Sequence, residues 1–354
     1  MPDVIFLVHG MGQFATGWDK TVKDQLESFC DAYSKPGQGD FKNRFKIVPI
    51  NYSELFLDIL KEWARQRQDL AGVTAQVGAD LVGKLMAWIA DDGTIEKSFF
   101  WSHVFDVITY RLLPTVRDAV QVRVALQIYE GFKDLDEDEN WSIIAHSLGT
   151  AVTHDMLQTW YTQPLAGGAQ IATAGGGTLG SHKAPFLVQM IANVSRILQN
   201  QYNVFDSDVR PGRACDFYFS AYHPLDPFTI LRPFLPTAWP GPPSPEKWSL
   251  QKLDADFIQQ ANIHDLAHYL RHPLVCIPLL RRLTYSTYIT KDSEAKYKSD
   301  FKLHGDLKAP ELIALRQKIE DAGVGLPDSW TSILELVNRV EELVKLATGG
   351  ANGS

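Results

Sequence analysis

The sequence has few of the features that mark secreted, membrane-spanning or nucleic-acid-binding proteins. Its 354 residues include only three cysteines, which lie far apart and form no CxxC pair, so we expect buried free thiols in a reducing compartment. No uncharged apolar stretch reaches the ~18 residues of a membrane span. The N-terminus lacks the basic region and the cleavage site of a signal peptide. These absences predict a cytoplasmic protein.

Basic runs and the common cofactor motifs are also missing. The formal net charge is −8, and no lysine- or arginine-rich run offers a face for nucleic acid. The sequence contains no HExxH, no Cys/His cluster and no phosphate loop, so we expect neither a metal ion nor an organic cofactor. Residues 175–180 fit GxGxxG by letters, but they do not follow a buried strand, and we interpret them as a loop.

The composition is that of a globular protein, and the pattern is that of an α/β fold. Hydrophobic residues make up 45% and charged residues 21%, which excludes wholesale disorder. Short apolar runs alternate with amphipathic stretches at 17–33 and 148–160, an order that predicts helices between the strands of a parallel sheet. The expected strands are residues 4–8, 45–52, 141–145, 186–194, 215–222 and 257–263.

The long region between the second and third expected strands is mostly helical in pattern. Apolar residues recur in it at every fourth position, at Val73, Val77, Leu81, Leu85 and Ile89. We interpret residues 54–132 as a helical lid or side lobe, with helices packed on the core as the alternative. Further expected elements are a loop at 165–182, helices at 264–272 and 307–348, and a disordered tail at 349–354.

A serine lies between a buried strand and a helix in the segment Ile-Ile-Ala-His-Ser-Leu-Gly-Thr at 143–150. Small residues stand two positions before and after Ser147, at Ala145 and Gly149. A nucleophile elbow needs this arrangement, because the serine sits at a strained backbone position that neighbouring chain approaches closely. The helix N-terminus would favour negative charge beside the hydroxyl. The alternative is a serine that starts a helix and has no chemical role.

The segment His-Gly-Met-Gly at 9–12 follows the first expected strand and forms a second candidate feature, which we call the HG loop. An acyl-transfer site needs two backbone N–H donors aimed at a developing oxyanion. The amides of Met11 and Leu148 can supply them. We expect His9 to form structural hydrogen bonds rather than act as a base. A tight turn between strand and helix is the alternative for this loop.

Candidate acids and bases lie further along the chain. Asp226 stands in a proline-held loop after the expected strand at 215–222 and could orient a histidine, although an Asp that caps a turn before proline is common. Asp206 and Asp208 are weaker candidates in a polar loop.

Among the histidines we favour His264, because it lies where the last expected strand meets a helix. His268, one helical turn later, is the runner-up base, and His272 at the far end of that helix is the weakest of the three.

Ser147, Asp226 and His264 occur in the chain order described for α/β-hydrolases, and that order differs from the other two common triad orders. The sequence resembles the α/β-hydrolase superfamily over residues 4–275, through the HGMG loop at 9–12, the AHSLG elbow at 145–149, the Asp-Pro pair at 226–227 and His264. The alanine in the elbow resembles that of some small bacterial lipases. The stretch FYFSAYHPLDP is similar to the acid loop of some intracellular phospholipases and related lipase-like serine hydrolases.

The resemblance implies one catalytic domain over 1–348, with a mostly parallel central sheet flanked by helices and the helical lid or side lobe inserted before the nucleophile strand. Residues with a structural part at the site would be His9, Gly10, Gly12, Ala145, His146 and Gly149.

We expect a serine hydrolase that cleaves a small-molecule or lipid ester with an apolar acyl group. The oligomeric state is left open. The alternatives are a thioesterase, amidase or peptidase with the same triad, a non-catalytic interaction module, and a protein that makes transient contact with a lipid surface through the proline-rich segment 223–245.

Overall fold

The computed structural model describes most of the chain between residues 3 and 301. The described residues are 3–12, 14–33, 41–65, 106–107, 109–111, 113–136, 139–162, 184–198, 204–226, 228–229, 233–241, 243–259, 263–284 and 289–301. The predicted helical stripe at 73–89, the loop at 165–182, the helices at 307–348 and the tail at 349–354 lie outside these residues.

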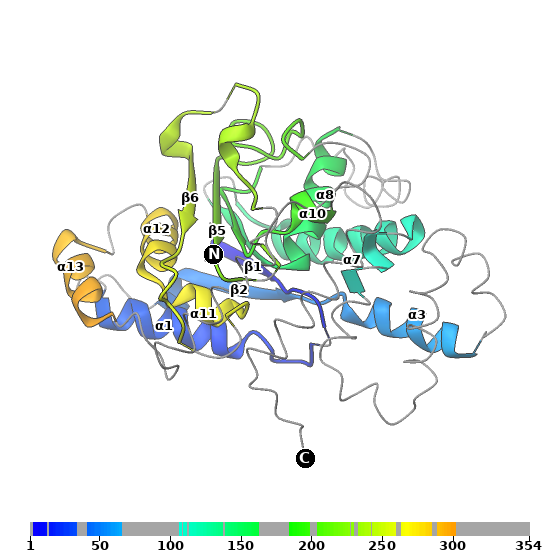
Figure 1. Cartoon of the computed structure of the whole chain (residues 1–354), viewed down its shortest axis with the longest axis horizontal. Coiled ribbons are helices and arrows are strands. Elements are labelled where there is room, and N and C mark those ends of the chain that lie inside the picture. The colour runs from blue at the N-terminus through cyan, green and yellow to red at the C-terminus, as the bar shows by residue number, and fades with distance from the viewer. Residues whose placement is uncertain are drawn as a thin grey trace, which may run out of the picture.

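The centre of the protein is a six-stranded sheet in which every neighbouring pair of strands is parallel, in the order β2-β1-β3-β4-β5-β6 (Figure 1). The predicted parallel α/β architecture is therefore confirmed. The strands are β1 (Asp3–Val8), β2 (Phe45–Ile50), β3 (Trp141–His146), β4 (Leu187–Ile191), β5 (Phe217–Tyr222) and β6 (Trp248–Lys252).

Helices cover both faces of the sheet, and each face has its own hydrophobic core. One face packs against α3 (Ser53–Arg65), α7 (Pro114–Phe132), α8 (Leu148–Thr162) and α10 (Ser195–Leu198). The other packs against α1 (Lys20–Tyr33), α2 (Phe41–Arg44), α11 (Leu266–Leu270), α12 (Pro273–Leu283) and α13 (Lys291–Asp300). Two short 3-10 helices, η2 (Pro236–Ala238) and η3 (Pro245–Lys247), lie in the proline-rich segment.

The sequence of β1 explains why both faces are covered. Successive side chains of a strand point to opposite faces. Phe6 accordingly belongs to the core under α7 and α8, whereas its neighbours Ile5 and Leu7 belong to the core under α1 and α12. A strand that is apolar at every position can be satisfied only when both faces are buried, as in parallel sheets.

The predicted last strand at 257–263 is wrong where the structure describes it. The last strand of the described sheet is β6, at Trp248–Lys252, and residues 257–259 belong to none of its strands; Phe257 N–H donates to the carbonyl of Asp254, and Ile258 N–H donates to the carbonyl of Asp256. The ring of Phe257 stacks on that of His268, so this residue is buried by a side-chain contact and not by pairing in the sheet. The sequence pattern does not indicate β6, because this edge strand contains polar residues and is only partly buried.

The predicted helix at 264–272 is present as α11, with shorter bounds, and a second helix, α12, follows it directly. α11 begins after Asp265, whose side chain accepts the His268 N–H, and α12 begins at Pro273 after the capping residue His272. Proline fits the first turn of a helix because the N–H it lacks has no partner there. Pro273 therefore starts α12.

Two expectations from composition can be compared with the structure. Cys30, Cys215 and Cys276 are buried and free, as predicted, and burial raises the pKa of the Cys30 thiol to about 12. Within the described ranges, each helix is too short or too polar to cross a bilayer.

Gly131 sets the distance between α7 and β1, which gives a first prediction. A Cβ at this position would lie 2.4 Å from an edge carbon of the Phe6 ring, which is fully buried. We expect Gly131→Ala to lower the free energy of unfolding by about 1–3 kcal/mol, because overpacking outweighs the better helix propensity of alanine. Urea unfolding measures this change. Leu126→Ala, at an exposed site of the same helix, is the control with little effect; a more stable Gly131→Ala protein would contradict the packing argument.

Candidate active site

Ser147 lies in the sharp turn that joins β3 to α8. Its φ angle is 53°, in the left-handed region that non-glycine residues seldom adopt, and its N–H donates to the carbonyl of Ile191 at the end of β4 (3.0 Å). Such a conformation costs about 1–3 kcal/mol and persists only where the surroundings impose it. The predicted strained elbow is therefore present at this serine.

Two glycines allow the turn after β3 to touch the turn after β1. A Cβ on Gly10 would lie 2.8 Å from the Cβ of Ser147, and a Cβ on Gly149 would lie 2.3 Å from the carbonyl oxygen of His9. Real Cβ atoms do not approach other atoms this closely, so neither position accepts a side chain without movement. Each of the two turns therefore has a glycine at the point where the other turn contacts it.

This contact lies at the point where the strand order reverses. β1 pairs with β2 on one side and with β3 on the other, and Val8 lies beside Ala145 in the register. Ligands of open parallel sheets bind outside the carboxyl ends of the strands at such a switch point. The HG loop and Ser147 both lie there.

His264 connects Ser147 to Asp226. The Oγ of Ser147 lies 2.6 Å from Nε2 of His264, and Nδ1 of His264 lies 2.8 Å from Oδ2 of Asp226. An ionised carboxylate only accepts hydrogen bonds, so Nδ1–H donates to Asp226 and Nε2 accepts from the serine hydroxyl. The structure brings together the three residues that the sequence analysis selected, and all three are buried.

Asp226 receives further hydrogen bonds that hold its carboxylate in place. Phe228 N–H donates to Oδ1 (2.9 Å), and the hydroxyl of Tyr269 donates to Oδ2 (2.6 Å). Burial alone would raise the pKa of Asp226, but the charge of His264 and these donors outweigh it, so that the pKa lies below its usual value.

Sequence reasoning missed Tyr269, whose hydroxyl also accepts the His223 N–H (2.9 Å). No spacing in the sequence links this tyrosine to Asp226.

His146 supports the loop that carries His264. Its Nε2 donates to the backbone carbonyl of His264 (2.5 Å), and the two rings lie 4.9 Å apart. Burial, assisted by the charge of His264, lowers the pKa of His146 to about 3, so the ring remains neutral. His146 therefore acts on the position of the next histidine and not directly on Ser147.

His9 is held by aromatic stacking at the root of the HG loop. Its ring stacks between Phe14 and Tyr52, with centroids 4.1 and 4.2 Å away. Its Nδ1 donates to the carbonyl of Gly10 (2.7 Å), and its Nε2 accepts the Tyr52 N–H (3.3 Å). Burial lowers its pKa to about 4, so His9 is a neutral hydrogen-bonding residue.

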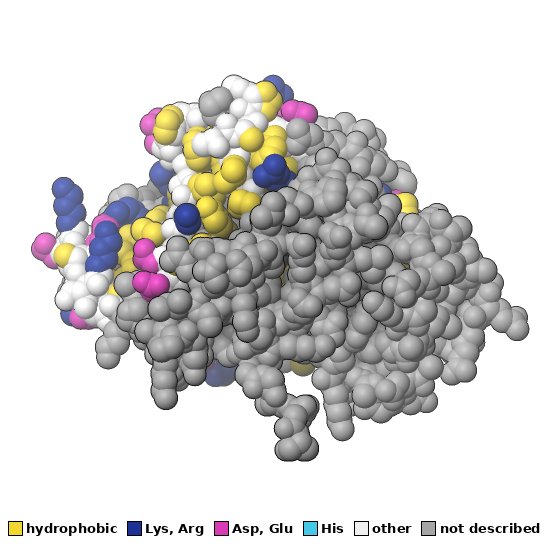
Figure 2. Space-filling view, in the orientation of Figure 1, with side chains coloured by type: hydrophobic (Ala, Val, Ile, Leu, Met, Phe, Trp, Pro, Cys, Tyr) yellow, Lys and Arg dark blue, Asp and Glu magenta, His cyan; other side chains and the backbone are white. Residues whose placement is uncertain are grey.

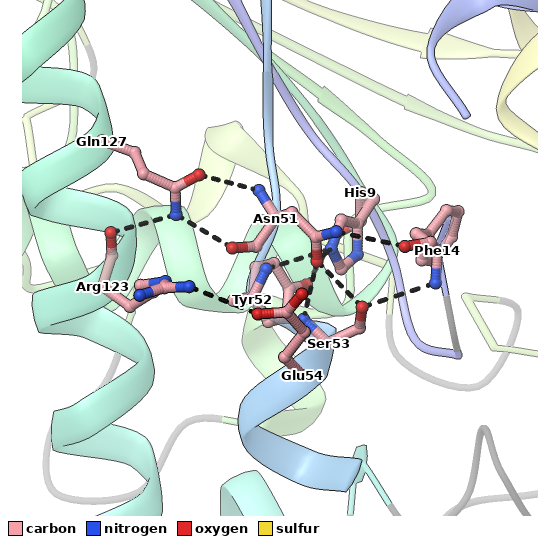
Figure 3. A network of polar contacts seen from close by, with 8 residues as sticks. All are labelled: His9, Phe14, Asn51, Tyr52, Ser53, Glu54, Arg123 and Gln127. Atoms are coloured by element: carbon pink, nitrogen blue, oxygen red, sulfur yellow. Dashed lines mark hydrogen bonds and ion pairs between the residues drawn. The ribbon is translucent and has the colours of Figure 1, made fainter. Parts of the chain in front are cut away.

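A polar network behind His9 ties this loop to two other elements (Figure 3). Asn51, just after β2, donates from its amide to the carbonyl of Phe14 (3.1 Å) and accepts from the hydroxyl of Ser53 (2.9 Å). Gln127 of α7 accepts the Asn51 N–H (3.1 Å) and donates to its carbonyl (2.9 Å). The far side of the HG loop is therefore anchored to β2 and α7.

The other residues considered from the sequence have different surroundings. Nε2 of His268 accepts the Gln259 N–H (3.2 Å), and its ring stacks on Phe257 (4.3 Å). His272 bonds to Asp254 (3.1 Å). The two histidines that were alternatives to His264 therefore bond to Gln259 and Asp254.

The weaker acid candidates also lie outside the chain of hydrogen bonds to Ser147. Asp208 pairs with Arg213 (3.4 Å), and Asp206 is exposed.

Leu148 and Met11 lie in the two turns beside Ser147. Leu148 is the first residue of α8, so its amide belongs to the group of N–H donors that a helix leaves unpaired at its start. Met11 lies between the two glycines of the HG loop, and its side chain is buried in the core under α7 and α8. In the described part of the chain, no group of three or more His, Cys, Asp or Glu residues could hold a metal ion.

Comparison with protein-family models and with curated proteins identifies no relative of this chain. The site therefore has to be interpreted from its own chemistry.

Buried histidines give a prediction for the pH dependence of stability. Burial lowers the pKa of each of six of them: His9, His146, His154, His223, His268 and His272. The unfolded chain binds protons at these sites below about pH 6.5, where the folded protein does not. The free energy of unfolding should therefore fall as the pH drops from about 6.5 to about 4, by up to about 1.4 kcal/mol per pH unit for each histidine.

Urea unfolding at pH 7.5, 6 and 5 measures this slope. His272→Asn is the matched control, because asparagine keeps a side-chain acceptor for the N-terminus of α12 and should reduce the slope by at most one proton. Equal stability at the three pH values would contradict the prediction.

Proposed function

We propose that this protein is a serine hydrolase that cleaves carboxylic esters through an acyl-enzyme on Ser147. The observation that carries the proposal is the continuous chain of hydrogen bonds from Ser147 Oγ through His264 to Asp226 (2.6 and 2.8 Å). A buried serine hydroxyl alone is inert, but one that donates to an imidazole held by a carboxylate can lose its proton during attack on a carbonyl.

The proposed reaction has two halves. Ser147 Oγ attacks the acyl carbon while Nε2 of His264 takes the hydroxyl proton, and Asp226 stabilises the imidazolium that forms. The alcohol then leaves with the proton returned by His264. In the second half, a water molecule gives a proton to His264 and attacks the acyl carbon. The acid leaves as the bond to Ser147 Oγ breaks, and His264 returns the proton to that oxygen.

The amides of Met11 and Leu148 are the proposed donors to the oxyanion. Leu148 directly follows the nucleophile at the start of α8, and Met11 adjoins Gly10, which lies against Ser147. Two N–H groups fixed beside the serine stabilise negative charge where it develops, which is the largest single contribution in many acyl-transfer enzymes.

We further propose that the fold is that of the α/β-hydrolases. The nucleophile follows a central strand through a strained turn and precedes a helix, as a nucleophile elbow requires. The acid follows β5 and the base follows β6 in chain order. The order serine, acid, histidine supports this fold over the other two folds that carry the same triad.

An ester with an apolar acyl group is the proposed substrate class. The ring of Phe228 lies 4.4 Å from that of His264, so an aromatic side chain flanks the base. Because Ser147 is fully buried, a substrate must displace the residues around its hydroxyl before attack. Thioesters and amides would use the same groups, and esters are preferred here because an alcohol is easier to expel than an amine.

Contact with a lipid surface stays a prediction. Hydrophobic side chains gather near the top of Figure 2, over β6 and the proline-rich segment, interspersed with lysine and arginine. Among the described residues, however, only Leu126 and Leu274 are large hydrophobic residues with substantial exposure, each 40%, and they lie on α7 and α12.

The nucleophile can be tested by labelling. A fluorophosphonate probe should modify the wild-type chain at Ser147, because only an activated serine reacts quickly with it, and Ser147→Ala should stay unlabelled. Mass spectrometry of the labelled peptide identifies the site. Ser195, a buried serine that starts α10, provides the control variant Ser195→Ala, which should label normally. Labelling that survives Ser147→Ala would show a different nucleophile.

The base and the acid can be tested by ester turnover. His264→Ala and Asp226→Asn should each lower kcat for p-nitrophenyl esters on the order of 10³-fold or more, because the serine loses its proton acceptor or the acceptor loses its orientation. His268→Gln keeps an acceptor for the Gln259 N–H and should retain most of the activity. A large loss in His268→Gln with none in His264→Ala would reverse the assignment.

Assays on acetate, octanoate and palmitate esters, each with and without a lipid emulsion, separate an esterase from a lipase. Activity on none of these esters, but on a thioester or an amide, would change the substrate class.

A further inference from the structure

We infer that Asp106 is a positioning residue for the oxyanion donor of the HG loop. Its carboxylate accepts the backbone N–H of Gly12 (2.7 Å) from a position 94 residues away in the sequence. This inference rests on the proposed function, because it assigns Asp106 a part in stabilising the oxyanion that forms at Ser147.

The argument begins with the peptide that carries the Met11 N–H. The carbonyl of this peptide belongs to Gly10, and it accepts from Nδ1 of His9 (2.7 Å); the hydroxyl of Tyr52, which donates to the His9 carbonyl (2.6 Å), lies 3.2 Å from it. In a trans peptide the N–H points away from the carbonyl. The Met11 N–H is therefore directed away from His9 and Tyr52.

The next peptide joins Met11 to Gly12. In the described part of the chain, Asp106 is the one side chain that accepts the N–H of this peptide. Gly12 has a φ of 105°, a conformation that is open to glycine and strained for other residues. A loop with glycine on both sides of Met11 has little steric resistance to rotation of its peptides. Hydrogen bonds from side chains must then supply the rigidity that an oxyanion donor needs.

The burial of Asp106 makes its ionised form costly. Asp106 is only 6% exposed, and burial raises its pKa to about 7 while the Gly12 N–H opposes that rise. Its charge also contributes to the raised pKa of Tyr52, so the two anchors of the HG loop lie near each other. An apolar residue here would avoid the cost of burying a carboxyl group, but it would remove the acceptor of the Gly12 N–H.

Two substitutions separate the acceptor from the charge. Asp106→Ala removes the acceptor and should lower kcat by about 10- to 100-fold, somewhat less than the loss of an oxyanion donor itself. Asp106→Asn keeps an oxygen that can accept the Gly12 N–H and should stay within about 3-fold of the wild type. KM should change by less than about 3-fold in both, since ground-state binding does not use the oxyanion.

A tetrahedral inhibitor gives a readout that a loss of stability would not change. An alkylboronic acid forms a negatively charged tetrahedral adduct with an active-site serine, so its affinity should fall in Asp106→Ala by the same factor as kcat/KM. Tyr110→Phe is the matched control, because it removes a partly buried hydrogen bond to Asp155 (2.9 Å) in the same stretch of chain without touching Gly12. It should keep both activity and boronate affinity.

The outcomes are distinguishable. If the wild-type protein neither reacts with a fluorophosphonate nor cleaves esters, the proposed function fails. If the wild type is active and Asp106→Ala matches it, or loses activity while its boronate affinity is unchanged, only the inference on Asp106 is overturned. An Asp106→Asn protein as impaired as Asp106→Ala would also overturn it. If Asp106→Ala does not fold, Asp106→Ser, whose short side chain cannot reach Gly12, carries the same test.

Discussion

The close approach of the turns after β1 and β3 is the constraint on which the site depends. The two strands are parallel neighbours in register, so their carboxyl ends bring the HG loop beside the elbow. Glycine at positions 10 and 149 lets each backbone reach the other, and the left-handed conformation of Ser147 is held between them. Removing either glycine would separate the turns and release the strain that presents the hydroxyl.

Burial divides the histidines around the site into two kinds. His9, His146, His223 and His268 lie in surroundings that lower their pKa values, and each bonds to the backbone. His264 instead bonds to a carboxylate on one nitrogen and to a hydroxyl on the other. The neutral histidines therefore form hydrogen bonds to the backbone. Because they carry no positive charge, they do not compete with His264 for the carboxylate of Asp226.

The sequence predicted the parts of the molecule that short-range patterns encode. Apolar runs predicted the parallel sheet apart from its last strand, and the small residues around Ser147 predicted the strained turn. The strand predicted around Phe257 is an error, because an aromatic residue that is buried against histidine rings cannot be told apart in sequence from one that is buried in a strand. The contacts of Tyr269 with Asp226 and of Asp106 with Gly12 span 43 and 94 residues, so no local pattern could reveal them.

The short helix α11 bears on both ends of the hydrogen-bond chain that starts at Ser147. Its Tyr269 holds the carboxylate of Asp226, and its capping residue Asp265 directly follows His264. All five residues of the helix are buried, so packing against neighbouring elements, rather than its own few hydrogen bonds, keeps it in place. A substitution that loosens this packing would displace Asp226 and His264 together, and the activity proposed above would then be lost while the sheet stays folded.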